Sequence, residues 1–304
     1  FDAANSSPAS FFMKIGIIGG SGLYEIDGVT DLQEHAIDTP FGAPSETIMG
    51  GRLGDNEVFF LPRHGRGHRL LPGELNHRAN IFALKDIGIE RILSFSAVGS
   101  FKEDLAPGDF VLIDQFVDRT RHTPKHTFFG DGIAGHIAFS HPTCDVLRHT
   151  LNDVCRGYLS QQDTTASVHS GGTYLNMEGP AFSTLAESML YKSWGMDVIG
   201  MTNMAEARLA REAEICYQTV AMVTDYDCWH ESHESVSVEM VIKTLMQNAA
   251  NAREIIKLAV PAVAAEARDC PCSSALACAV ITSPDAIAPE TVERLRPIVG
   301  KYLT

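Results

Sequence analysis

The chain has 304 residues, 45% of them hydrophobic and 20% charged, so it can bury the core of one large domain or two small ones. A formal net charge of −14 without any run of basic residues argues against a nucleic-acid-binding surface, and predicts that an anionic ligand is held in a local pocket. The apolar stretches are too short to span a bilayer, and residues 1–12 lack the pattern of a secretory signal. We expect a cytoplasmic protein with an N-terminal extension, residues 1–12, before residues 13–304.

The first half of the chain predicts short strands joined by polar segments. Apolar β-type runs occur at 14–18, 58–61, 91–95 and 110–113, and a helical stripe of apolar residues occurs at 76–87. Residues 120–141 are rich in His, Gly and Pro without a clear period, which predicts a long loop.

The second half predicts helices that alternate with strands. A helix begins near residue 142, and Ser183 is expected to cap another. The remaining predicted elements are strands at 172–177, 198–201 and 219–223, a helix at 206–213, a long amphipathic helix at 236–258 interrupted by Pro261, and one last helix within 275–304. No repeat or linker divides the chain, so we expect a single α/β domain.

Three of the predicted strands end in groups that can donate hydrogen bonds. The first runs into a glycine-rich turn that contains Ser21, the second into Arg63 and His64, and the third into Ser96 and Ala97. The glycine spacing does not fit a dinucleotide-binding turn, but exposed backbone N–H groups, hydroxyls and an arginine fork all suit an oxyanion. These strand ends are expected to converge on one anion, although a tight turn and a solvated basic loop are simpler readings of each motif alone.

Two acids, Asp225 and Asp227, follow the apolar strand at 219–223 and are separated by one aromatic residue. Polar groups at the carboxyl end of a strand in an α/β sheet usually face a ligand crevice. Asp is also common at helix starts, so an N-cap with a solvated turn acid is the simpler alternative. The functional interpretation is a pair of carboxyls that contact neighbouring nitrogens of a heterocycle, one of them able to deliver a proton.

Metal binding and redox chemistry find little support in the motifs. Two histidine pairs have a four-residue spacing but lie among Gly and Pro, and the histidines of residues 230–233 do not form His-Glu-x-x-His. Seven cysteines are an odd number, which argues against a disulfide framework. Cys270 and Cys272 flank one proline, a spacing of neither a zinc knuckle nor a Cys-x-x-Cys redox site. We expect no metal site, and the redox state of this pair stays open.

Five motifs, in this order along the chain, resemble the trimeric purine nucleoside phosphorylase family, and more closely its 5′-deoxy-5′-methylthioadenosine phosphorylase branch. The resemblance covers roughly residues 13–260. It rests on Gly19-Gly20-Ser21-Gly22, Arg63-His64-Gly65-Arg66, Glu178-Gly179-Pro180-Ala181-Phe182-Ser183, Gly200-Met201-Thr202 and Thr224-Asp225-Tyr226-Asp227-Cys228-Trp229.

The resemblance implies a central mixed, twisted sheet flanked by helices and a set of site residues. The implied phosphate site consists of Ser21, Arg63, His64, Ser96, Ala97 and Thr202. The base and ribose would pack on Phe182 and Met201, with Ser183 nearby. Asp225 would hydrogen-bond purine N7, Asp227 would hydrogen-bond the 6-amino group, and His136 would contribute to a neighbouring subunit's site.

The implied reaction is phosphorolysis of S-methyl-5′-thioadenosine to adenine and 5-methylthioribose 1-phosphate, with phosphate as co-substrate and no cofactor. A protonated Asp225 would assist the leaving purine, and the carboxylate of Asp227 would select a 6-aminopurine. An apolar stripe, Val238, Val241 and Ile242, would suit a 5′-methylthio group, although plain helix core explains it equally well.

Three alternatives stay open at this point. A phosphorylase of 6-oxopurine nucleosides or methylthioinosine would share the fold. A non-catalytic nucleoside-binding protein would retain ligand without turnover, and a dehydrogenase would bind NAD. The expected assembly is a homotrimer, which can pair into a hexamer.

Overall fold

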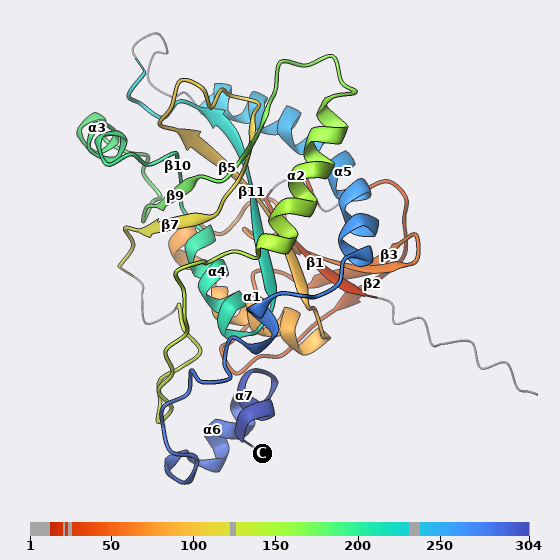
Figure 1. Cartoon of the computed structure of the whole chain (residues 1–304), viewed down its shortest axis with the longest axis vertical. Coiled ribbons are helices and arrows are strands. Elements are labelled where there is room, and N and C mark those ends of the chain that lie inside the picture. The colour runs from red at the N-terminus through yellow and green to blue at the C-terminus, as the bar shows by residue number, and fades with distance from the viewer. Residues whose placement is uncertain (1–12, 21, 24–25, 122–125, 231–237, 304) are drawn as a thin grey trace, which may run out of the picture.

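The computed structural model describes residues 13–20, 22–23, 26–121, 126–230 and 238–303, with the backbone alone at 238–241. Within these residues eleven strands form one mixed sheet, and helices pack on both of its faces (Figure 1). The expected α/β architecture is therefore confirmed. No helix in this part of the chain is both long and apolar enough to cross a membrane.

The strands are β1 Lys14–Gly19, β2 Val29–His35, β3 Ile48–Leu53, β4 Asn56–Pro62, β5 Arg91–Ser100, β6 Phe110–Leu112, β7 Gln115–Asp118, β8 Val168–Ser170, β9 Thr173–Asn176, β10 Val198–Gly200 and β11 Cys216–Asp225. Seven of the eleven strands lie at predicted positions, whereas β2, β3, β7 and β8 were not predicted. The α-helices are α1 His77–Ile87, α2 Asp145–Leu159, α3 Leu185–Ser193, α4 Asn203–Glu212, α5 Val238–Ala265, α6 Pro289–Arg294 and α7 Arg296–Leu303.

Strands β5 and β11 form the centre of the sheet. They run parallel, paired from Arg91 with Cys216 to Gly99 with Asp225, and the first nine residues of β11 are buried. Burial of both faces explains why this strand is a nearly continuous apolar run. Its carboxyl end therefore delivers Asp225 from the most rigid part of the sheet.

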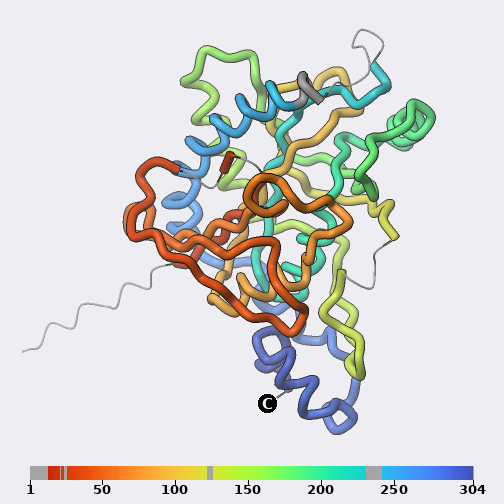
Figure 2. The backbone as a smooth tube through the Cα atoms, turned by 180° about the vertical axis from the view of Figure 1, so that it is seen from behind, coloured from red at the N-terminus to blue at the C-terminus, as the bar shows by residue number. Residues whose placement is uncertain are grey.

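Two helical layers cover the sheet. Helices α2 and α5 pack together and against β11 on one face, whereas α4 packs against β11 and α1 on the other (Figures 1 and 2). The C-terminal helices α6 and α7 contact each other, and α7 also contacts α1. The apolar residues form one large cluster beneath α2 and α5 and another beneath α1 and α4.

The strand that pairs with one edge of β5 changes from β1 to β10 along its length. Strand β1 pairs with Arg91–Ser94, and β10 pairs antiparallel with Gly99 and Ser100 further along the same edge. Residues 95–98 lie between these two pairings, at the carboxyl end of β1. Such a switch in strand order is where open α/β sheets bind ligands.

Three local predictions were wrong. Helix α3 is capped by Thr184, not Ser183: the Thr184 hydroxyl accepts from the N–H of Glu187, whose carboxylate accepts from the Thr184 N–H in turn. Helix α5 continues through Pro261 to Ala265, because packing of its apolar face outweighs one lost backbone hydrogen bond. The C-terminal region contains two short helices, α6 and α7, rather than one.

Candidate active site

A cavity of about 350 Å³ lies at the partner switch, at the carboxyl ends of β1, β4, β5 and β11. Its walls include nine of the site residues expected from the sequence: Arg63, His64, Ser96, Ala97, Phe182, Met201, Thr202, Asp225 and Asp227. Ser21 lies outside the described residues, but its neighbour Gly20 lines the same cavity. Segments 162 residues apart in sequence, at Arg63 and Asp225, thus meet around one space.

Arg63 is almost wholly buried and is bound mainly by a carboxylate from α4. Its Nε and Nη2 donate to the two oxygens of Glu206, Nη2 also donates to Ser94 Oγ at 2.7 Å, and Nη1 donates to the Phe95 carbonyl at 2.9 Å. Burial by itself lowers the pKa of Arg63, but the carboxylate of Glu206 more than offsets this effect, so the pKa of Arg63 is raised overall. A guanidinium has five N–H donors, so one N–H on Nη1 remains for a ligand.

The close Arg63–Glu206 pair has an electrostatic consequence for anion binding. Because the two charges compensate each other, Arg63 cannot by itself neutralise an anion in the cavity. An anion here depends also on polarised N–H groups, hydroxyls and the start of α4. The guanidinium of Arg63 therefore offers a well-positioned N–H donor rather than net positive charge.

His64 stays neutral in this environment. Burial and the charge of Arg63 lower its pKa to about 4. Its Nδ1 lies 2.9 Å from the Leu70 carbonyl, which can only accept, so Nδ1 carries the proton. The ring also stacks on His68 with centroids 4.3 Å apart. A neutral His64 therefore presents Nε2 as an acceptor, suited to the hydroxyl of a protonated phosphate.

Thr202 lies at the N-terminus of α4 and is buried. Unpaired N–H groups and the helix dipole at such an end attract anions. The Tyr174 hydroxyl lies 3.5 Å from the Thr202 N–H, and a Cβ at Gly200 would overlap that hydroxyl. Glycine is thus required where β10 turns into α4, which places Thr202 against the cavity.

Asp225 is mostly buried, and burial together with the charge of Asp227 raises the pKa of its carboxyl. Oδ1 accepts from the Asp227 N–H at 2.8 Å, and Oδ2 lies 2.7 Å from the Thr224 hydroxyl. A Cβ at position 99 would lie 3.0 Å from Oδ1 of Asp225, so the glycine at this position leaves the carboxyl open to the cavity. Asp225 is positioned to hold and release a proton.

Asp227 is also buried and has a left-handed backbone, with φ of 50°, which Asp tolerates better than most residues. Burial raises the pKa of its carboxyl. Within the described structure its Oδ2 has no hydrogen-bond partner. A buried carboxylate oxygen of this kind needs a donor, and the cavity that it lines is where a ligand amino group can supply one.

The apolar part of the cavity differs from the stripe expected on α5. Leu245, Leu71 and Pro72 line it, whereas Ile242 is 49% exposed and lies outside the lining. The side chains of Val238 and Val241 lie outside the described residues. Neither Ser183, which is half-buried, nor His136 lines the cavity; the His136 N–H pairs with the Ala279 carbonyl.

Sequence reasoning missed the residues that hold the donors in place. Glu206 accepts from Tyr217 at 2.9 Å and from Ser94 at 2.8 Å, in addition to Arg63. Asn203 donates to the Tyr217 and Ser94 oxygens at 2.8 and 2.9 Å. The only available signal was a single acid on a short amphipathic helix, which is common on solvated surfaces, and its partner lies 143 residues away.

Comparisons with known proteins identify the family of the chain. The sequence profile of the family described as "Phosphorylase superfamily" matches residues 14–261. The S-methyl-5′-thioadenosine phosphorylases of Geobacter sulfurreducens and Gloeobacter violaceus are 55% and 52% identical over 289 residues; both alignments cover 95% of this chain, and they cover 99% and 96% of those proteins.

Solved structures give the same result. A methylthioadenosine phosphorylase from an Antarctic soil metagenomic library has a TM-score of 0.88 and 44% identity, over 94% of this chain and 99% of that one. The Schistosoma mansoni methylthioadenosine phosphorylase in complex with adenine has a TM-score of 0.79 and 38% identity, over 84% of this chain and 94% of that one. The family resemblance seen in the motifs is therefore confirmed, and the chain belongs to the phosphorylase superfamily, among the S-methyl-5′-thioadenosine phosphorylases.

Proposed function

We propose that this protein catalyses phosphorolysis of S-methyl-5′-thioadenosine, giving adenine and 5-methylthioribose 1-phosphate. The observation that carries the proposal is one cavity lined both by anion-suited donors and by two buried carboxyls of raised pKa. Such a cavity can hold phosphate beneath a ribose carbon and a purine above it. The relatives named for this activity support the choice of nucleoside.

Phosphate would bind among Thr202 at the start of α4, the free N–H of Arg63, Nε2 of His64, the Ser96 hydroxyl and the Ala97 backbone, with Ser21 as a further proposed donor. Ser96 and Thr202 are buried, so water competes weakly for their hydroxyls. These groups would place a phosphate oxygen against C1′ of the ribose. Inorganic phosphate is then the co-substrate, and the proposed chemistry needs no organic cofactor or metal.

Asp225 would assist departure of the base. As the N9–C1′ bond breaks, its electron pair moves into the purine, and the proton of Asp225 passes to N7. A phosphate oxygen forms the new bond to C1′, which limits the life of the oxocarbenium-like ribose. Phe182 and Met201, on the cavity wall, would pack on base and ribose with Ser183 nearby, and the apolar surface of Leu245 and Leu71 would accept the methylthio group.

The decisive experiment measures adenine release from methylthioadenosine with and without phosphate. We expect adenine and methylthioribose 1-phosphate to form in equal amounts, and only in the presence of phosphate. Absence of adenine above the phosphate-free control would contradict the proposal. Binding of methylthioadenosine without turnover would instead favour a non-catalytic nucleoside-binding protein.

Replacement of Asp227 by asparagine is expected to change the preferred base. A carboxylate accepts from the 6-amino group of adenine, whereas an amide can donate to the 6-oxo group of hypoxanthine or guanine. We expect the ratio of kcat/KM for methylthioadenosine to that for methylthioinosine to fall about 10- to 100-fold. The control is Cys228→Ser, next to Asp227 but outside the cavity lining; an unchanged ratio in Asp227→Asn would remove Asp227 from base selection.

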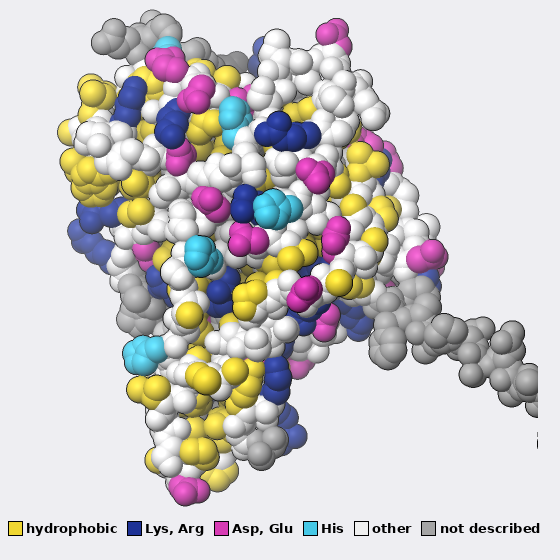
Figure 3. Space-filling view, viewed as in Figure 1, with side chains coloured by type: hydrophobic (Ala, Val, Ile, Leu, Met, Phe, Trp, Pro, Cys, Tyr) yellow, Lys and Arg dark blue, Asp and Glu magenta, His cyan; other side chains and the backbone are white. Residues whose placement is uncertain are grey.

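We also propose that the chain assembles as a homotrimer in the cytoplasm. Apolar side chains gather over α3 (Figure 3), where Leu185, Met189, Leu190 and Trp194 are each 44–59% exposed. This surface adjoins the cavity, because Phe182 lines the cavity and is 55% exposed in the isolated chain. A neighbouring subunit on this surface would cover Phe182, and His136 is the proposed contribution to a neighbour's site.

The assembly can be checked by light scattering coupled to size-exclusion chromatography. We expect a mass about threefold that of the chain, and Met189→Glu should dissociate it because a buried unpaired charge is unfavourable at an apolar interface. The control is Leu32→Glu on β2, which is as exposed as these residues but lies at the other end of the sheet. A wild-type monomer, or a trimer unaffected by Met189→Glu, would contradict this arrangement.

A further inference from the structure

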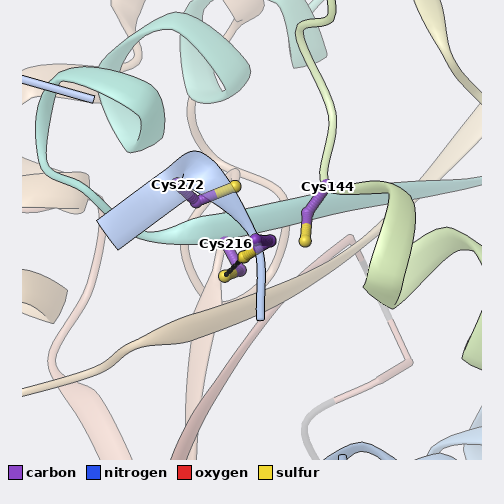
Figure 4. Close-up of side chains that lie close together, drawn as sticks. Cys144, Cys216 and Cys272 are labelled. Atoms are coloured by element: carbon purple, nitrogen blue, oxygen red, sulfur yellow. Dashed lines mark hydrogen bonds between the residues drawn. The ribbon is translucent and has the colours of Figure 1, made fainter. Parts of the chain in front are cut away.

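Four cysteines meet at the end of the sheet that is remote from the cavity. The Sγ atoms of Cys144, Cys216, Cys270 and Cys272 all lie within 4.8 Å of one another, and Figure 4 labels Cys144, Cys216 and Cys272. Three of the four are buried and Cys270 is half-buried. All four are free thiols, and Sγ of Cys216 lies 3.4 Å from Sγ of Cys270.

The four thiols come from three separate parts of the fold. Cys144 is the residue before α2, and Cys216 is the first residue of β11. Cys270 and Cys272 flank Pro271, where the chain begins a 3-10 turn, Pro271–Ser274, after leaving α5. The two cysteines of this turn reach the other two thiols across up to 128 residues of sequence, from 144 to 272.

The spacing of the sulfur atoms fits a tetrahedral thiolate site. Zinc binds cysteine sulfur at about 2.3 Å, so the sulfurs of a tetrahedral site lie about 3.8 Å apart. The observed limits, 3.4 Å for one pair and 4.8 Å for all pairs, enclose this value. A disulfide needs a separation of about 2.05 Å and joins sulfurs only in pairs, whereas here four sulfurs are mutually close.

One arginine lies where such a site would need positive charge. Four thiolates around one divalent zinc carry a net charge of about −2. The side chain of Arg268 interacts with the Cys216 sulfur and with the carboxylate of Glu90. The Nε of Arg268 is buried and has no hydrogen-bond partner within the described structure.

We propose that Cys144, Cys216, Cys270 and Cys272 bind one zinc ion as a structural tetrathiolate site. Four protein ligands leave no open position for a substrate, and Cys216 lies at the opposite end of β11 from Asp225, about 30 Å away. The site joins the segment from residue 266 to residue 303, which includes α6 and α7, to the central strand. Its role is therefore stability of this segment rather than catalysis.

The first test measures zinc by mass spectrometry in the full-length protein, purified without chelators in a reducing buffer. We expect about one zinc per chain in the wild type and less than about a tenth of that in Cys216→Ser or Cys272→Ser. The matched control is Cys278→Ser, an exposed cysteine of the same segment outside the cluster, which should retain the ion. Zinc retained by both cluster variants would overturn the proposal.

The second test uses only the wild-type protein, so it does not depend on folding of the variants. Zinc is removed by a chelator, and cobalt is then added as a spectroscopic probe. Tetrahedral cobalt thiolate should give intense visible and charge-transfer absorption, and zinc should displace it. Each ion bound should release up to about four protons, because the ligating thiols ionise.

Comparing the zinc-bound with the metal-free protein distinguishes a structural role of this site from a role in catalysis. The chelated protein should have a Tm lower by at least about 5 °C, with phosphorolysis at low temperature changed less than about twofold. Metal-free wild-type protein whose four cluster thiols are reduced but take up neither zinc nor cobalt would overturn the proposal. So would disulfides among these cysteines in freshly purified protein, since a disulfide sulfur is not a thiolate ligand.

Discussion

Replacing Asp225 with alanine is expected to lower kcat for methylthioadenosine about 10²- to 10⁴-fold, with a smaller change in the KM for phosphate. The proposed proton transfer to the purine disappears, whereas the proposed phosphate donors on the cavity wall stay in place. Steady-state kinetics at varied nucleoside and at varied phosphate measure the two effects separately. Asp225→Asn should be less severe, because an amide can still donate a hydrogen bond to N7 but cannot transfer a proton readily.

The same role of Asp225 predicts the direction in which kcat changes with pH. Burial raises the pKa of Asp225, and the protonated form is the one proposed to act, so kcat should fall as pH rises through that pKa. This basic limb should be absent in Asp225→Asn. Stability has the same sign: a carboxyl with a raised folded-state pKa stabilises the fold fully below its unfolded pKa, and this contribution is lost as pH rises through the folded pKa.

The control for Asp225 is Asp86→Ala, which removes an exposed acid on α1. This variant should retain wild-type kcat and wild-type pH dependence. If Asp225→Ala kept kcat within about threefold of the wild type, Asp225 would not be the proton donor. Thermal unfolding of each variant establishes that the loss of activity does not reflect loss of the fold.

Replacing Arg63 with methionine is expected to lower both stability and phosphate binding. The Glu206 carboxylate would remain buried without its cationic partner, a situation that costs about 3–5 kcal/mol. The remaining N–H that Arg63 offers to phosphate would also be lost. We expect kcat/KM for phosphate to fall at least about 100-fold, measured together with the free energy of unfolding in urea.

The double variant Arg63→Met/Glu206→Met separates these two effects. Removing both charges should restore part of the lost stability, because no buried charge then lacks a partner. The recovery stays incomplete, since Ser94 and Tyr217 lose their acceptor. Phosphate use should not recover. If the double variant were as unstable as Arg63→Met, or regained activity for phosphate, the role assigned to Arg63 would be wrong.

Seven of the eleven strands and most helices could be predicted because their signals are local. Apolar runs such as 219–223 bury both faces of a strand, and polar residues at strand ends mark a ligand crevice wherever the sheet is open. One error arose where tertiary packing outweighed a local rule: Pro261 does not end α5, because the residues around it pack into the core. Another error was a missed local signal, because Thr184 rather than Ser183 caps α3 and Glu187 completes its capping box.

Short motifs in the sequence were enough to identify the family, the α/β fold and nine of the residues that line the cavity. Which groups meet across the chain depends on the tertiary structure. It paired Arg63 with Glu206 and so left Arg63 without net charge to offer, and it placed the apolar wall at Leu245 rather than Ile242. It also brought Cys144 and Cys216 to the turn at Cys270 and Cys272, where the spacing of two cysteines had suggested no metal site. Contacts between residues more than a hundred positions apart are set by how strands order themselves in the sheet, and no local pattern records that order.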